Sequence, residues 1–168
     1  MATQLLSRAL RLLDRCVDTT MRAAVFLVLP VSLLLFLQWP LREIVRGYSR
    51  EANDLAQILF ALYVSVAVTA ATRERSHLAA DAIARRFSPR WRDRLHRLAC
   101  LAILIPTSLF VLYDAAPAAW QSLLQLERFP ETLNPGYFLV RLAVLLLAAL
   151  VLAQAILDLF ARRDSPPP

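Results

Sequence analysis

Four long stretches of apolar residues, separated by polar segments, divide the chain. They cover about residues 23–41, 52–72, 98–124 and 136–160. An α-helix rises 1.5 Å per residue, so about 20 apolar residues cross the roughly 30 Å hydrocarbon core of a bilayer. Each stretch is long enough. The pattern predicts an all-α integral membrane protein with four transmembrane helices, folded as a single membrane domain over residues 1–168.

The composition fits this prediction. Apolar residues make up 58% of the chain and charged residues 19%, with only two glycines. The formal charge of +6 comes entirely from arginine, because the chain has no lysine. These arginines gather at the ends of the apolar stretches, where they set topology. Since no soluble basic domain carries them, nucleic acid is not expected as a partner.

The distribution of arginine predicts the orientation. Four arginines precede the first span, eight lie between the second and third spans, and two lie in the tail. The other side has five: Arg42, Arg46, Arg50, Arg128 and Arg141. Basic residues are enriched on the cytoplasmic side. We therefore expect a multi-pass protein of the bacterial inner membrane with both termini cytoplasmic, ending in a disordered tail over residues 164–168.

The middle loop is expected to contain a short helix. Apolar residues recur there at helical spacing, in Leu78, Ala79, Ala82, Ile83 and Phe87. Charged residues such as Asp81 occupy the other side. This pattern predicts an amphipathic arm over about residues 77–88 that lies in the interface against membrane lipids. Trp91 and nearby arginines then anchor the next helix at the headgroups. A solvated charged loop that only enforces topology is the alternative.

Few residues offer catalytic or cofactor chemistry. The two histidines, His77 and His96, lie near the cytoplasmic surface, so they cannot bracket a haem between helices. Cys16 and Cys100 have no paired spacing that indicates a disulfide or a metal site. No glycine-rich phosphate loop is present. We expect neither an enzyme nor a bound cofactor or metal.

Two charges lie well inside the predicted spans, away from their ends. Asp114 falls in the third span and Arg141 in the fourth. Counted back from their shared loop, both lie toward the outer half of the bilayer. Charges inside a membrane usually pair with one another. A structural ion pair between these two residues is the first interpretation, and a functional site is the second.

Two segments resemble a known transporter family. Residues 73–81, Arg-Glu-Arg-Ser-His-Leu-Ala-Ala-Asp, resemble the arginine…His-Ile/Leu-x-Val/Ala-Asp signature of the small, DctQ-like transmembrane subunit of tripartite ATP-independent periplasmic transporters. Its matching residues are Arg75, His77, Leu78 and Asp81. Residues 126–138 are similar to the Phe-Pro-Asp-Thr-x-Asn-Pro-Gly-Tyr-Phe run before the last helix in one branch of that family. Where the family often has a Glu-Leu pair at the second span, this chain has Asp54-Leu55.

The resemblance implies a partner rather than a carrier. In this family a large membrane subunit binds the substrate and sodium and moves by an elevator motion. A periplasmic substrate-binding protein delivers the substrate, typically an organic acid anion. The resemblance implies that this chain scaffolds the fixed part of the large permease subunit as a heterodimer, in a symport system.

The loop before the fourth span is a candidate contact surface. It faces the side on which a binding protein would dock, and two prolines stiffen it. We expect this loop to contribute to docking or to the seam with the large subunit through Glu127, Arg128, Pro130, Glu131, Thr132, Asn134, Pro135 and Tyr137. An ordinary proline turn is the alternative interpretation.

Two other functions remain open from the residues. A membrane anchor of a respiratory complex would show haem absorbance, and the missing mid-span histidines argue against it. An autonomous small carrier would support uptake when expressed alone. Carriers usually build their site from broken helices and internal repeats near the bilayer midplane, and no inverted repeat is visible here.

Overall fold

The computed structural model describes residues 2–44, 50–73 and 88–160. These form α1 (Ala2–Glu43), α2 (Arg50–Arg73), α4 (Pro89–Ala99), the π-helical turn η1 (Cys100–Leu104), α5 (Ile105–Leu124) and α6 (Tyr137–Phe160). Four segments are long and apolar enough to cross a membrane: Arg8–Pro40, Arg50–Arg73, Arg97–Leu124 and Tyr137–Phe160. The predicted all-α membrane fold with four transmembrane helices is confirmed.

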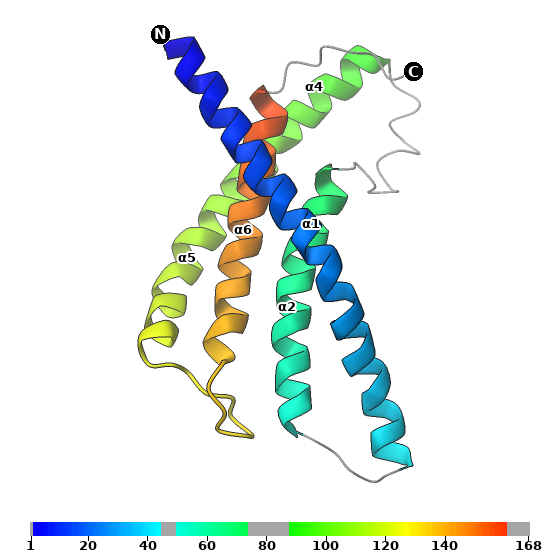
Figure 1. Cartoon of the computed structure of the whole chain (residues 1–168). Helices are drawn as coiled ribbons and strands as arrows, with labels where there is room; N and C mark the ends of the chain where they lie inside the picture. The colour runs from blue at the N-terminus through cyan, green and yellow to red at the C-terminus, as the bar shows by residue number, and fades with distance from the viewer. Residues whose placement is uncertain (1, 45–49, 74–87, 161–168) are drawn as a thin grey trace.

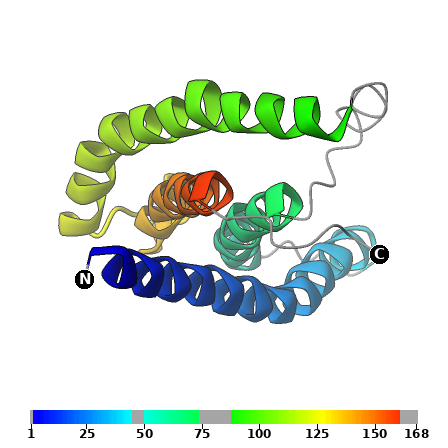
Figure 2. The same cartoon turned by 90° about the horizontal axis from the view of Figure 1, so that it is seen from above.

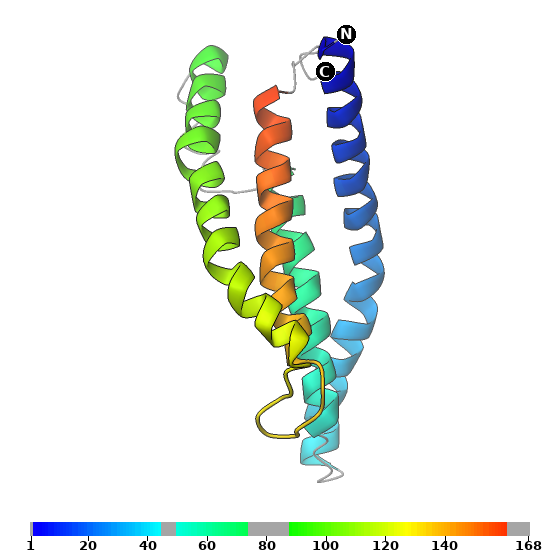
Figure 3. The same ribbon diagram turned by 90° about the vertical axis from the view of Figure 1, so that its left-hand side faces the viewer.

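The helices form a flat bundle with α2 and α6 in the middle. Figure 2 shows α1 on one side of this central pair and the continuous α4–α5 segment on the other. Helix α6 contacts α1, α2 and α5. The start of α1 and the end of α6 lie at one end of the bundle, and the loop between α5 and α6 lies at the opposite end (Figures 1 and 3).

Helix α1 is longer than the span predicted for it. It has 42 residues, or about 63 Å at 1.5 Å per residue, which is about twice the hydrocarbon thickness. No glycine or proline interrupts the segment from Ala2 to Leu29. The polar N-terminal segment therefore joins the same helix, and an ion pair of 2.7 Å between Asp18 and Arg22 lies on its surface. Pro30 and Pro40 both lie inside α1.

The third span contains a π-helical turn that the sequence analysis did not anticipate. Here the Ile105 amide donates to the Cys100 carbonyl, five residues back. Pro106 follows at once, and its ring has no N–H and crowds the carbonyl four residues earlier. A widened turn accommodates that proline without ending the helix. The Cys100 side chain is buried beneath this turn.

Small residues bring α2 and α6 together. Ala56 and Ser65 on α2 are buried, as are Ala143 and Ala148 on α6. The Ser65 hydroxyl donates to the Ala143 carbonyl across the helices at 2.8 Å. In lipid, helices associate through such close backbone approach and interhelical hydrogen bonds. The central pair is therefore closely packed.

Two predicted features lie outside the described residues. One is the interfacial arm over residues 77–88, of which only Ser88 is described. The other is the disordered tail over residues 164–168.

We expect Ala143→Leu to destabilise the bundle, because its side chain is buried where α2 comes closest to α6. Overpacking of this kind costs about 1–3 kcal/mol. The measurement is the melting temperature of the purified protein in mild detergent. Val144→Leu is the matched control, since Val144 is exposed on the same helix. Equal melting temperatures for the two variants would contradict the close α2–α6 contact.

Candidate functional site

The α5–α6 loop, residues 125–136, folds back on itself. The Arg128 and Pro135 backbones form an isolated antiparallel bridge. The Glu127 carbonyl accepts hydrogen bonds from the Gly136 and Tyr137 amides at 3.3 and 3.1 Å. Two further backbone bonds of 2.9 Å close the tip, from the Phe129 amide to the Asn134 carbonyl and from the Leu133 amide to the Phe129 carbonyl. The loop is thus a small ordered unit rather than a loose connection.

An aromatic side chain fixes this loop to the helices. Phe129 is only 3% exposed. Its ring meets Tyr137 edge-on, with centroids 5.5 Å apart. Gly136 adjoins it with a φ of 143°, and a Cβ there would lie 3.1 Å from the Ile58 side chain and 3.4 Å from Phe129. Glycine is required by both the backbone conformation and the space.

The Glu127 carboxylate has two side-chain partners, both within this chain. Arg141 approaches its carboxylate with two guanidinium nitrogens, each at 2.8 Å. The Ser122 hydroxyl donates to the same carboxylate. The Arg141 guanidinium also lies 5.7 Å from the centroid of the Tyr137 ring. Glu127 therefore ties the end of α5 to the first turn of α6.

This arrangement corrects the ion pair expected between Asp114 and Arg141. Arg141 is paired with Glu127 instead. Asp114 lies on an exposed face of α5, and no ion pair to it occurs among the described residues. The helix places Asp114 ten residues before the end of α5, while Arg141 is only four residues after the start of α6. At 1.5 Å per residue the two lie at depths that differ by about 9 Å.

A second contact joins the loop to α2. Asp54 is 7% exposed near the start of that helix, and the Thr132 hydroxyl donates to its carboxylate. The backbone amide of Asn134 in turn donates to the Thr132 hydroxyl at 3.4 Å. From the sequence, Asp54 stood out only as part of the Asp54-Leu55 pair in the resemblance, and no contact was predicted for it. The sequence signal for this contact was that Asp54 and the polar α5–α6 loop are expected at the same end of the bundle.

The remaining loop residues point outward. Arg128, Pro130, Glu131 and Pro135 are exposed. Two leucines are exposed with them, Leu126 at 56% and Leu133 at 66%. Both leucines have positive φ angles, of 46° and 58°. Such angles are uncommon outside glycine. The loop thus presents a mixed charged and apolar surface, and Glu127 contributes to its support rather than to its exposed face.

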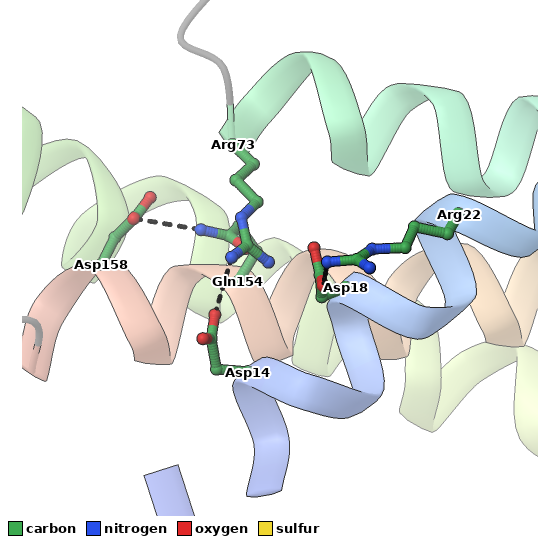
Figure 4. A network of polar contacts seen from close by, with 6 residues as sticks. All are labelled: Asp14, Asp18, Arg22, Arg73, Gln154 and Asp158. Atoms are coloured by element: carbon green, nitrogen blue, oxygen red, sulfur yellow. Dashed lines mark hydrogen bonds and ion pairs between the residues drawn. The ribbon is translucent and has the colours of Figure 1, made fainter. Parts of the chain in front are cut away.

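The opposite end of the bundle has its own polar cluster (Figure 4). Arg73, at the end of α2, bonds Asp14 on α1 at 2.9 Å. On α6 the Gln154 amide donates to Asp158 at 3.1 Å. A cavity of about 400 Å³ lies between these groups, and its lining comprises Leu10, Arg11, Asp14, Arg73, Gln154, Leu157, Asp158 and Phe160. The Arg73–Asp14 pair joins α2 to α1, the Gln154–Asp158 bond lies within α6, and neither was predicted from the sequence.

Of the predicted arm motif and its anchor, the structure describes only Trp91. Arg75, His77, Leu78, Asp81, Ile83 and Phe87 lie outside the described residues. Trp91 is described, is 56% exposed, and lies 5.7 Å from the Arg94 guanidinium.

The polar clusters at the two ends of the bundle consist of structural hydrogen bonds and ion pairs. Their acids are engaged by arginine, serine, threonine or glutamine. In the part of the chain that is described, no group of three or more histidine, cysteine, aspartate or glutamate side chains is placed to hold a metal ion. The arrangement fits a structural or interaction role.

Comparison with known protein families gives one match. The family described as "Tripartite ATP-independent periplasmic transporters, DctQ component" matches residues 31–164. This range includes the last 13 residues of α1, the other three spans and the α5–α6 loop. No curated protein and no solved structure matches the chain.

We expect Glu127→Gln to loosen the α5–α6 loop, because it removes the charge that Arg141 and Ser122 engage. Hydrogen bonds to a charged group contribute about 1.5–3 kcal/mol, and partial exposure brings the loss toward the lower value. Limited proteolysis of the loop in detergent provides the measurement. Glu131→Gln, an exposed acid of the same loop, is the control. Equal cleavage rates in both variants would contradict the bracing role.

Proposed function

The chain belongs to the family of DctQ components of tripartite ATP-independent periplasmic transporters, and on that premise we propose that it scaffolds the large permease subunit. Together with a periplasmic substrate-binding protein, the two would import an organic acid anion by ion-coupled symport. The observation that carries this proposal is the family match over residues 31–164, which covers the end of the first span and the whole of the other three. The family is a transporter component family and not an enzyme family.

The internal contacts of the bundle support a stationary role. The central helices α2 and α6 run without interruption over 24 residues each. Carriers of their own substrate usually have broken helices at the midplane. Polar groups at both ends of this bundle are engaged in contacts between helices. A rigid body of this kind suits a subunit that stays fixed while its partner moves.

We further propose that the end containing the start of α1 faces the cytoplasm. The excess of arginine at that end supports this orientation in the bacterial inner membrane. Trp91 and Arg94 lie at the same end, and tryptophan favours the headgroup level. The α5–α6 loop would then face the periplasm.

In that orientation the α5–α6 loop is placed to contact the binding protein or the large subunit. Its exposed charges, Arg128 and Glu131, would steer a partner, and its exposed leucines would add apolar contact. Backbone strain held by surrounding structure often marks functional segments. The positive φ angles of Leu126 and Leu133 are of this kind.

Affinity purification tests the proposal. We expect the tagged chain, extracted gently from its native membranes, to bring down a multi-span permease in near-equal amount, identified by mass spectrometry. Recovery of the chain alone as a stable, monodisperse species would refute the scaffold role. Haem absorbance in the purified complex would instead indicate a respiratory anchor.

A charge exchange tests the loop. We expect Arg128→Glu combined with Glu131→Arg to weaken binding of the purified binding protein to the membrane complex by about tenfold, or about 1.4 kcal/mol. Surface plasmon resonance on complexes in nanodiscs measures this affinity. Glu51→Arg, an exposed acid near the same end, is the control. If neither the affinity nor recovery of the large subunit changes, the loop is only a turn.

A further inference from the structure

The exposed face of α5 carries a line of polar side chains. Thr107, Asp114 and Gln121 are all exposed. They lie seven residues apart, which is close to two helical turns, so they follow one stripe along the helix. At 1.5 Å per residue the stripe runs for about 21 Å, through most of the membrane-spanning part of α5. We call these three residues the α5 polar stripe.

Asp114 lies deep within the span. It is ten residues from the end of α5, or about 15 Å at the helical rise, and the hydrocarbon core is about 30 Å thick. A carboxylate at this depth is costly when it faces lipid, and such groups almost always face protein or a water-filled cavity. Asp114 is exposed and points away from the helices that the structure describes. Its surroundings must therefore come from another molecule.

Helix α1 offers a contrast on the other side of the bundle (Figure 2). Its outward face presents Phe26, Leu29, Leu33 and Phe36, each more than half exposed. The segment from Ala23 to Leu41 contains no charged residue. That face is suited to lipid as it stands. The two flanks thus differ in chemistry, and only α5 requires a polar partner.

A second copy of this chain does not meet the requirement. Copies inserted in the same orientation and paired symmetrically through α5 would place each Asp114 at the level of its counterpart. Two carboxylates at one depth in a medium of low dielectric repel each other. The partner must instead bring a cation or hydrogen-bond donors to the level of Asp114.

We propose that the α5 polar stripe is the surface on which the large permease subunit docks, with a basic side chain of a permease helix facing Asp114. This inference rests on the proposed function. Seven-residue spacing fits a helix that crosses α5 at about 20°. Exposed Ala116 and Ala118 allow its backbone to come close. Aromatic side chains flank the stripe, including Tyr113 at 83% exposure and Phe110 at 67%.

Site-specific photocrosslinking tests the docking face in the intact transporter. A benzophenone amino acid is placed at Tyr113 on α5 or at Phe26 on α1, two positions of matched exposure, 83% and 79%. We expect ultraviolet light to join the chain to the large subunit from position 113 and not from position 26. The native complex is used throughout, so a folding defect is detected as loss of copurification before irradiation.

The crosslinking outcomes separate the two proposals. Crosslinks from position 26 alone would overturn this inference while leaving the scaffold role intact. Crosslinks from position 113 to a second copy of the chain would overturn it as well. If no permease copurifies and neither position crosslinks to one, the scaffold role itself fails.

Substitutions at Asp114 test the chemistry of the contact. We expect Asp114→Leu to lower recovery of the large subunit per tagged chain by about tenfold, which matches the loss of a polar contact between membrane helices of 1–2 kcal/mol. Asp114→Asn keeps hydrogen bonding and should retain most of the recovery. Unchanged recovery with leucine, at equal accumulation of the chain, would show that Asp114 does not contribute to docking.

Discussion

A polar group inside a bilayer has no water to bond, and this constraint organises the whole chain. Ser65 meets it by donating to a carbonyl of the neighbouring helix. Asp54 accepts from Thr132, and Glu127 accepts from Ser122 and Arg141. Each of these contacts joins segments that are far apart along the chain or joins the α5–α6 loop to a helix beside it. The same bonds that satisfy polar groups therefore also hold the helices in place.

The result is a body braced at both ends. At one end the α5–α6 loop is fastened to α2 and α6, and at the other end Arg73 connects α2 to α1. Between them, small residues let α2 and α6 pack closely. A subunit built in this way resists sliding and tilting of its helices. That property suits the scaffold role proposed for this chain.

The sequence predicted four membrane-spanning helices because length and apolar content alone decide their number. It did not predict which charges meet. Arg141 and Asp114 were counted from a shared loop as though that loop were a simple turn. In the structure the loop folds back, so the Glu127 carboxylate, and not Asp114, pairs with Arg141 near the start of α6. The rotation of a helix about its axis is also invisible to a count of depth, and it is this rotation that turns Asp114 outward. The π-helical turn before Pro106 escaped prediction for a similar reason, because the helix adapts locally instead of ending.

Exposure has a different meaning in lipid than in water. In water an outward aspartate is ordinary, and an outward phenylalanine draws notice. In a bilayer the reverse holds. The aromatic face of α1 can face lipid, whereas the α5 polar stripe needs a polar partner. Of the charges within the four predicted spans, Asp54, Arg141 and Asp158 have partners inside this chain, and no partner for Asp114 occurs in the described part of the chain. Because a carboxylate at this depth almost always faces protein or water, we infer that another protein covers Asp114. The incomplete face of α5 therefore indicates that the bundle is one part of a larger membrane assembly, as its family membership independently implies.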